Sequence, residues 1–195
     1  MITILFGASL LATTTLSSSA MMPDDDGISK EEIIERTVSF LKERKPRSSD
    51  ERIWTIANSV YEESQKYDMD YRLILALMKV ESNFRNSAVS NRGARGLMQV
   101  MPSSARMISR DAGIELKGVK CLHVPETNIT LAVNYLSKLQ GMFDNTTSAL
   151  HAYNAGPARV RKPAPGGTAR STAFTRKVLD EYRKISEILP EADEE

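Results

Sequence analysis

The sequence predicts an all-α fold in which short helices surround one hydrophobic core. Apolar residues recur every three or four positions in several segments, which is the spacing of a helix with one buried face. No segment shows the sustained polar–apolar alternation of a half-buried strand. The chain has 195 residues, of which 41% are hydrophobic and 26% charged. It can therefore bury one core, and it is too short for two large domains.

Helix-starting residues place the elements along the chain. Ser29, Asp50 and Asp70 are short polar residues that can cap the N-terminus of a helix. Pro102 suits the first turn of another helix. Helical segments are expected at residues 29–44, 50–61, 71–84, 102–108, 128–139, 146–153 and 171–189, with loops that include 113–118 and 163–167.

These features divide the chain into four regions. Residues 1–20 carry no charged side chain and end in small residues, so we expect a cleaved export signal, with a retained anchor or a disordered tail as alternatives. Residues 21–49 are expected to form a linker and an N-terminal helix that packs on the main domain or acts as a spacer. Residues 50–189 would be the main domain, and residues 190–195 an acidic tail.

Composition excludes several classes of function. Lys and Arg together number 26, against 25 Asp and Glu, so the chain lacks the basic excess that is typical of nucleic-acid-binding proteins. Its single cysteine cannot form an internal disulfide. Because the only histidines are His123 and His151, we expect no metal site, and we expect no other cofactor.

One carboxylate lies on the apolar face of its helix. Glu81 follows Ile74, Leu77 and Met78 at spacings of seven, four and three residues, so it shares their stripe. Partial removal from water disfavours the charged form of a carboxyl group and raises its pKa. A general acid needs such a pKa near neutral pH. Taken alone, this helix would more simply carry a glutamate that is salt-bridged or lies at the edge of its stripe, and the surrounding motifs favour the catalytic interpretation.

The segment 90–99 contains two glycines and could fold over the end of the Glu81 helix as one wall of a cleft. In this segment Ser90 could hydrogen-bond Glu81 and hold its orientation. Gln99 can both donate and accept hydrogen bonds, which suits the acetamido or hydroxyl groups of a sugar. Each residue could also be an ordinary turn residue.

A further cluster, Ala152 to Pro157, combines a helix stop with a phenol and an amide. Gly156 and Pro157 are typical of a helix C-terminus. Tyr153 and Asn154 present side chains that can bind carbohydrate, although a capped helix with a packed tyrosine would give the same pattern.

Together these strings resemble the soluble lytic transglycosylase (SLT) family in order and spacing. The motifs are Glu81-Ser82-Asn83-Phe84, Ser90 with Gly93 to Gln99, Asn128-Ile129 with Tyr135-Leu136, and Ala152 to Pro157. The resemblance covers roughly residues 53–189. It implies a goose-type, lysozyme-like bundle of short helices around one substrate cleft, here with an extra N-terminal helix. It also implies cleavage of the β-1,4 bond between N-acetylmuramic acid and N-acetylglucosamine in peptidoglycan, which leaves a 1,6-anhydro sugar end.

The resemblance assigns Glu81 as the single catalytic acid and base. It implies a substrate-binding set made up of Ser90, Met98, Gln99, Met101, Tyr153, Asn154 and Gly156. Ser90 would orient Glu81 or contact the sugar, and Tyr153 would direct its hydroxyl at either. Peptidoglycan strands would be the partner, at an exported, periplasmic or cell-envelope location. The N-terminal helix could there dock onto an envelope protein complex.

Three positions depart from the family's pattern. Asn86 stands where proline is frequent, Ala132 replaces the usual glycine of the third motif, and Phe174 stands where an aromatic hydroxyl often precedes the last helix. The last departure leaves a substrate contact by a second tyrosine without support. None of the three involves Glu81.

Most glycosidases use two carboxylates, but no acidic residue lies within the glycine-rich or Tyr-Asn motifs. We therefore expect one carboxyl to act twice, assisted by the acetamido group of the substrate. Two alternatives stay open, namely a muramidase that hydrolyses the same bond with water and a non-catalytic peptidoglycan-binding module.

Overall fold

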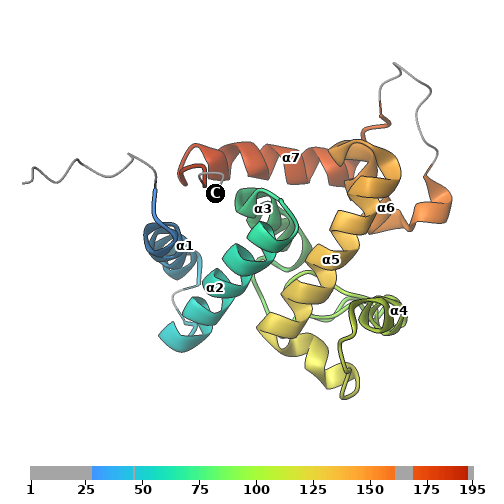
Figure 1. Cartoon of the computed structure of the whole chain (residues 1–195), viewed down its shortest axis with the longest axis horizontal. Helices are drawn as coiled ribbons and strands as arrows, with labels where there is room; N and C mark the ends of the chain where they lie inside the picture. Colours follow the sequence, from blue (N-terminus) through green and yellow to red (C-terminus); the bar gives the residue numbers. More distant parts are fainter. Residues whose placement is uncertain (1–27, 46, 161–168, 193–195) are drawn as a thin grey trace, which may run out of the picture.

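The computed structural model describes residues 28–45, 47–160 and 169–192. Its helices are α1 (Lys30–Arg44), α2 (Asp50–Lys66), α3 (Tyr71–Ser82), α4 (Pro102–Ala112), α5 (Pro125–Phe143), α6 (Thr146–Ala155) and α7 (Ala173–Ser186), with short 3₁₀ helices η1 (Val119–His123) and η2 (Pro157–Arg159) (Figure 1). In these ranges β-structure is limited to isolated bridges from Arg95 to Val89 and Val100. The predicted all-α class is confirmed.

Several expectations lie outside the described residues. These are the export signal at residues 1–20, most of the linker that follows it, the loop at 163–167 and the last residues of the acidic tail. Among the described residues, no helix combines the length and the apolar character needed to cross a bilayer.

The helix starts follow the predicted capping residues closely. Ser29 and Asp70 each accept a hydrogen bond from a backbone N–H group of the first turn, so both predicted caps are confirmed. The cap of α2 was predicted one residue too late, because Ser49 caps it and Asp50 is its first residue. The Asp50 carboxylate then lies in the first turn, where the helix dipole stabilises negative charge. Pro102 begins α4, as predicted.

The helix ends were predicted less well. α3 stops at Ser82, short of the predicted Phe84, because Asn83 and Phe84 adopt left-handed backbone angles with φ of 52° and 59°. α5 begins before the predicted position, since Pro125 occupies its first turn without needing a hydrogen-bond acceptor.

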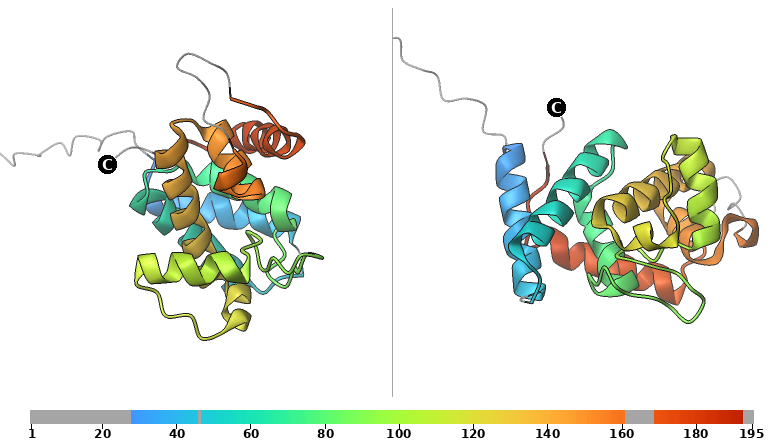
Figure 2. Two further views of the ribbon diagram at one scale, coloured as in Figure 1. Left: turned by 90° about the vertical axis from the view of Figure 1, so that its right-hand side faces the viewer. Right: turned by 90° about the horizontal axis from the view of Figure 1, so that it is seen from below.

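α3 is the central helix of the fold. Every residue from Tyr71 to Met78 is buried, which explains why this segment is apolar on nearly all sides. α7 packs along α3, while α2 packs against both α1 and α5, and α5 carries α6 (Figures 1 and 2). The position of α3 between α2 and α7 fixes the end of the helix that carries Glu81.

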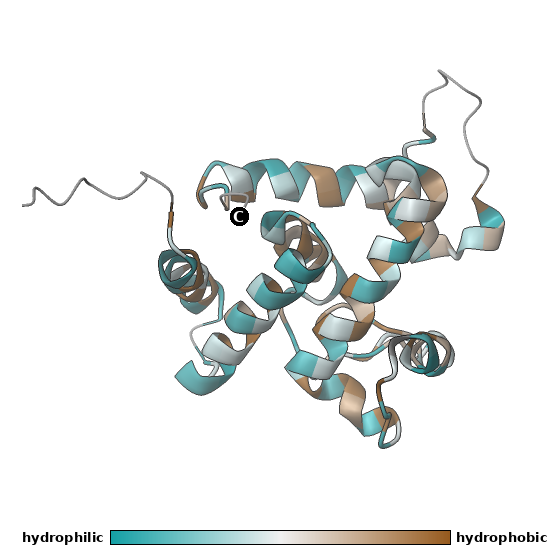
Figure 3. Cartoon of the chain, viewed as in Figure 1, coloured by the Kyte–Doolittle hydropathy of each residue, from teal (hydrophilic) through white to brown (hydrophobic). Residues whose placement is uncertain are grey.

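The N-terminal helix α1 is packed on the domain, which settles the choice between a packed helix and a spacer. Its buried residues are mostly apolar, and the hydrophobic colour of the α1 ribbon lies on the side turned toward the bundle (Figure 3). Phe40 meets the fully buried Phe84 edge to face, with ring centroids 6.1 Å apart. The Lys45 ammonium group donates a hydrogen bond to the Phe84 carbonyl. Burial of a phenylalanine contributes roughly 1.5–3 kcal/mol, so α1 stabilises the turn that follows α3.

Candidate active site

Glu81 lies in the last turn of α3, at the edge of a completely buried face. Ile74, Leu77 and Met78 on that face have no exposed surface. Glu81 is itself partly buried, and this burial raises the pKa of its carboxyl from 4.5 to about 7. Desolvation is the cause of the shift, and among the described residues no hydrogen bond or ion pair contributes to it. In this part of the chain Glu81 is therefore not a salt-bridged glutamate, and a large share of its carboxyl is protonated at neutral pH.

The chain leaves α3 through a left-handed turn. The Ser82 hydroxyl donates to the Met78 carbonyl at 3.2 Å and accepts from the Arg85 N–H at 3.1 Å. Positive φ angles at non-glycine residues such as Asn83 each cost on the order of 1 kcal/mol. Burial of the next side chain, Phe84, offsets that cost. The turn ends the helix directly after Glu81 and leads into the glycine-rich loop.

Gly96 is the point at which this loop approaches the rest of the domain. Its φ is +81°, and a Cβ atom at this position would lie closer than 3.0 Å to the Leu122 carbonyl oxygen and to the Asn128 amide. Gly93 has a similar φ of +85°, but nothing lies within 4 Å of its Cβ position. Gly96 is therefore required by space as well as by backbone angle, whereas Gly93 is required by angle alone.

The buried side chain of Asn128, on α5, holds the loop against the domain. Its Oδ1 accepts a hydrogen bond from the Met98 N–H at 2.8 Å, and its Nδ2 donates to the carbonyls of Arg95 and Leu122, both at 2.9 Å. Asn128 has no exposed surface, so these bonds satisfy an amide that would otherwise be buried without partners. The resemblance named this residue without giving it a role. A polar residue among the apolar positions of α5 was the available signal.

Tyr153, on α6, bonds the loop and lies close enough to Glu81 to feel its charge. Its hydroxyl donates to the Met98 carbonyl at 2.8 Å. The hydroxyl proton is therefore not directed at Glu81, which was one of the two predicted targets of this group. Its ring lies 5.8 Å from the Tyr135 ring, centroid to centroid. Burial raises the pKa of Tyr153 well above its usual value, and the charges of Glu81 and Tyr135 raise it further. Tyr153 therefore stays neutral over the pH range in which Glu81 ionises.

Other predicted site residues serve the structure of the loop. Ser90 accepts hydrogen bonds from two backbone N–H groups of its own turn, at 3.0 and 3.3 Å, and these bonds hold the turn and do not reach Glu81. Gln99 has φ of +50° and donates its amide to two loop carbonyls at 2.9 and 3.3 Å. The Met98 side chain is completely buried, so it supports the wall from behind, while Met101 is 37% exposed.

An open cleft of about 530 Å³ lies between the end of α3 and α7. From α3 and α6 it is lined by Lys79, Val80, Glu81 and Asn154. From α7 it is lined by Ala173, Phe174, Lys177, Asp180, Glu181 and Lys184. Of the predicted substrate-binding residues, Asn154 shares this cleft with Glu81, and Gly156 ends the helix on which Asn154 lies.

The α7 wall was not predicted from the sequence, and it carries charge of both signs. Asp180 is ion-paired with Arg183, and Glu181 with Lys184 at 3.7 Å. Two carboxylates therefore share the cleft with Glu81, although no acidic residue lies in the sequence motifs around it. The helical spacing of Ala173, Lys177, Asp180 and Lys184 along one side of α7 was the only signal for this wall.

The side chains of this site are those of acid–base chemistry and hydrogen bonding. Within the described ranges, no group of three or more His, Cys, Asp or Glu side chains is placed to hold a metal ion.

Comparison with known proteins agrees with this arrangement. A family model described as Transglycosylase SLT domain matches residues 58–172. Membrane-bound lytic murein transglycosylase C of Klebsiella pneumoniae subsp. pneumoniae is 38% identical over 125 residues, which cover 59% of this chain and 35% of that protein. The protein of the same name from Edwardsiella ictaluri is 37% identical over 164 residues, which cover 76% of this chain and 45% of that protein. The chain thus spans less than half the length of these relatives.

A solved structure extends the agreement to three dimensions. It is an inactive mutant of lytic transglycosylase Slt from Pseudomonas aeruginosa, in which glutamine replaces a glutamate. Its similarity has a TM-score of 0.60 with 25% sequence identity, covering 82% of this chain and 31% of that one. This match confirms the expected lysozyme-like class. Since the family model spans both Glu81 on α3 and Tyr153 on α6, the chain belongs to the transglycosylase SLT domain family.

Proposed function

We propose that this chain is a peptidoglycan lytic transglycosylase. It cleaves the β-1,4 bond between N-acetylmuramic acid and N-acetylglucosamine and leaves a 1,6-anhydromuramic acid end. The observation that carries the proposal is the Glu81 carboxyl, with a pKa of about 7, at the edge of an open cleft. Such a group can both give and receive a proton near neutral pH. Family membership and the names of the relatives, which are lytic murein transglycosylases, support the substrate class.

The reaction needs one carboxyl acting twice. Protonated Glu81 donates its proton to the glycosidic oxygen as the bond from that oxygen to C1 of muramic acid breaks. The 2-acetamido group of the same sugar stabilises the positive C1 through its carbonyl oxygen. Ionised Glu81 then removes the proton from the C6 hydroxyl, whose oxygen bonds to C1. The carboxyl ends protonated, as it began, and no water is consumed.

The other predicted residues would position the substrate. Asn154 lies in the cleft and can bind acetamido or hydroxyl groups. Ser90, Gln99 and Met101 lie on or next to the loop that Asn128 holds, and their exposed atoms would contact the glycan. Gly156 would shape the groove at the end of α6.

The deciding experiment separates cleavage without water from hydrolysis. Purified sacculi are digested with the chain, and the released muropeptides are weighed by mass spectrometry. Anhydro ends, lighter by one water than reducing ends, are expected. Reducing ends would instead identify a muramidase. In that case Asp180 and Glu181, which share the cleft, would be the candidates for a base that activates water.

A non-catalytic binding module is the alternative from another class. It predicts that sacculi bind the chain without releasing any muropeptide. The partly buried Glu81 favours catalysis, since a binding surface has no need of a carboxyl with a raised pKa.

An exported, periplasmic or cell-envelope location is part of the proposal. Peptidoglycan lies there, and relatives carry the names membrane-bound and soluble lytic murein transglycosylase. Residues 1–20 would direct the export. Docking of α1 onto an envelope protein complex would be compatible with its packed position, because the outward face of this helix is polar.

Activity should fall on the alkaline side with an apparent pKa of about 7. The proton that Glu81 donates is present below this pH and is lost above it, since burial raises the pKa of this carboxyl to about 7. Turnover of soluble glycan strands measured across the pH range gives the profile. Asp180→Asn is the control and should keep the same alkaline limb. An alkaline limb near pH 4.5, the ordinary value for a glutamate, would contradict the assignment.

Tyr153→Phe should reduce turnover by about tenfold, because the Met98 carbonyl loses its donor and the loop wall loosens. Tyr71→Phe is a matched control. It removes a hydroxyl hydrogen bond of the same kind, to the Pro190 carbonyl at 2.7 Å, away from the loop. Both variants should lose similar stability in thermal unfolding, and only Tyr153→Phe should lose activity per folded molecule. Equal activity in the two would show that the Tyr153 hydroxyl has no part in the site.

A further inference from the structure

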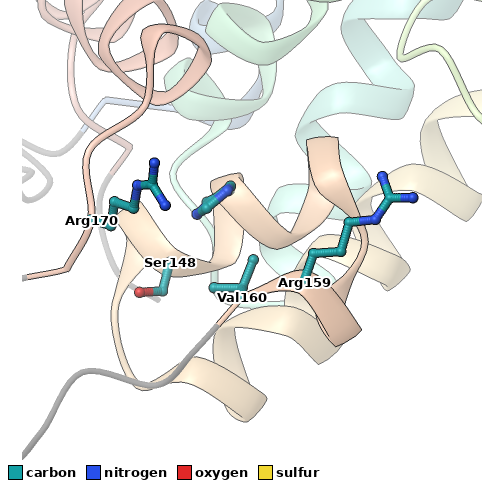
Figure 4. Close-up of a pocket in the computed structure, with 5 residues that line it drawn as sticks. Ser148, Arg159, Val160 and Arg170 are labelled. Atoms are coloured by element: carbon teal, nitrogen blue, oxygen red, sulfur yellow. The ribbon is translucent and has the colours of Figure 1, made fainter.

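A pocket of about 200 Å³ beside α6 does not form a second site. It is lined by Ser148, His151, Arg159, Val160 and Arg170. Figure 4 shows its two arginines on opposite sides of Ser148 and Val160, so their guanidinium groups do not converge on one ligand. A surface with better-defined chemistry lies at the opposite end of the domain, on α1 (Figure 1).

A groove of about 400 Å³ runs between α1 and the turn that follows α7. The C-terminal end of α7 comes close to α1 at this place (Figures 1 and 2). From α1 the groove is lined by residues between Glu32 and Glu43, and from the turn by Ile188 and Leu189. These residues lie outside the range 58–172 that the family model matches, and none of them lines the cleft that contains Glu81. Family membership therefore assigns this groove no function.

The centre of the groove is apolar. Phe40 and Leu189 lie at its base, and each is 3% exposed. Ile188 is 54% exposed, which is the largest exposed fraction of any large hydrophobic side chain in the described part of the chain. A partner that covers Ile188 with an apolar side chain would remove both apolar surfaces from water, which favours binding.

The rim of the groove is acidic. Glu32, Glu35 and Glu43 line it, against one arginine, Arg36. Glu32 is ion-paired with Arg36, and Glu43 with Arg44 at 3.4 Å. Within the described ranges Glu35 forms no ion pair, so its carboxylate is available to a cation from outside the chain.

The sequence adds negative charge on both sides of the groove. Asp24, Asp25 and Asp26 precede α1, and Glu191, Asp193, Glu194 and Glu195 follow Leu189. The chain as a whole has a net charge of +1, so acidic residues are concentrated in and next to the segments that form the groove. Like charges repel, which makes the acidic ends of this chain poor occupants of the groove and a basic partner the complementary one.

The groove has the length for a helical partner. Glu32, Arg36, Ser39 and Glu43 follow one another at spacings of four, three and four residues, so they form one stripe along α1. From the first to the last of them α1 rises about 16 Å, which matches about three turns of a second helix. An amphipathic helix contacts such a groove with side chains three and four positions apart. Its apolar side chains would cover Ile188, and basic side chains beside them would meet the glutamates.

We propose that this groove binds a basic amphipathic helix of another protein. An apolar side chain of that helix lies over Ile188, and its Lys or Arg side chains pair with Glu35 and Glu43. The inference rests on the proposed function in one respect, since it gives the partner chemistry for the docking of α1 onto an envelope protein complex. The same acidic rim would be repelled by the anionic surface of a membrane, so the occupant is a protein segment.

Binding of a designed peptide tests the groove. The probe is a helical peptide of about 14 residues, with leucines three and four positions apart and lysines around them. A second peptide has the same composition in a scrambled order that lacks the apolar stripe. Titration calorimetry at low salt should give a Kd at least about tenfold lower for the ordered peptide, and this difference should shrink as salt is added. Equal binding of the two peptides, or no binding of the ordered one, would overturn the inference.

Variants of the groove locate the binding. Glu35→Lys combined with Glu43→Lys should raise the Kd of the ordered peptide by about tenfold, because attraction becomes repulsion. Ile188→Ala should raise it by about fivefold, since it removes apolar contact surface. Glu62→Lys and Met142→Ala are the matched controls, because both residues are exposed and neither lines the groove or the cleft. Equal effects of the groove variants and their controls would contradict the proposal.

Two further measurements distinguish the other outcomes. Light scattering should show no self-association through the groove; a dimer that Ile188→Ala dissociates would place a second copy of this chain there and would overturn the proposal. Release of muropeptides from sacculi should be the same for the groove variants as for wild type, and a loss would mean that the groove serves the reaction itself. If the wild-type chain cleaves no peptidoglycan, the proposed function fails, and the peptide titration still decides whether the groove binds a basic helix.

Discussion

Glu81→Gln is expected to abolish cleavage of peptidoglycan. Glutamine keeps the shape of the side chain but can neither donate the proton to the glycosidic oxygen nor take one from the C6 hydroxyl. Loss of general acid–base assistance typically lowers the rate by about 10²- to 10⁴-fold, and here the same group serves both steps. Turnover is measured from anhydromuropeptides released from sacculi. Wild-type turnover by this variant would refute the mechanism.

Glu181→Gln and Asp180→Asn are the matched controls for this variant. Both residues line the same cleft as Glu81, and both already pair with a cation on α7. Each of these two variants should keep most of the wild-type activity and should still produce anhydro ends. A loss as large as that of Glu81→Gln in either control, together with reducing ends in the wild type, would show that a second carboxylate works as a base.

Glu81→Gln should also stabilise the folded chain at alkaline pH. A glutamate with a pKa of 4.5 when unfolded and about 7 when folded binds more protons in the folded state between these values. The contribution of Glu81 to the free energy of unfolding is then fully present below about pH 4.5 and is lost as the pH rises through 7. Glutamine does not ionise, so the variant should exceed wild type by up to about 3 kcal/mol at about pH 8 and match it at about pH 4. Denaturant unfolding at the two pH values tests this, and it also verifies that the inactive variant is folded.

The part of the site that lies on one helix could be predicted from the sequence. The stripe of Ile74, Leu77 and Met78 placed Glu81 on a buried face, because the helical period alone decides which side chains share a face. The structure bears this out, with burial as the cause of the raised pKa. The helix end was harder, since the burial of Phe84 outweighs the local preference for continuing α3.

The part of the site made by distant segments could not be predicted. Lys177 and Glu181 enter the cleft because α7 packs along α3, and nothing in the local sequence states that contact. Asn128 likewise binds a loop 30 residues away at Met98, and Tyr153 reaches the same loop from α6. For Asn128 and Tyr153, a hydrogen bond between separate elements makes the residue part of the site. The sequence pattern predicts only the helix on which each residue lies.

Gly96→Ala should strongly destabilise the chain, and Gly93→Ala should do so only mildly. Both glycines have left-handed φ angles, of +81° and +85°, so each substitution carries a backbone strain of about 1 kcal/mol. At Gly96 the new methyl group would also collide with the Leu122 carbonyl and the Asn128 amide. Relief of that collision moves the loop away and breaks the hydrogen bonds of a buried amide. The total loss should be about 3–5 kcal/mol.

Thermal unfolding of the two alanine variants measures the difference. For a chain of this size the expected losses correspond to a fall in Tm of roughly 10 °C or more for Gly96→Ala and a few degrees for Gly93→Ala. Activity per folded molecule should follow the same order, because the loop that Asn128 holds also carries the Met98 carbonyl to which Tyr153 bonds. Equal losses in the two variants would mean that backbone angle alone sets the requirement for glycine. The close approach of the loop to α5 would then have no part in holding the site together.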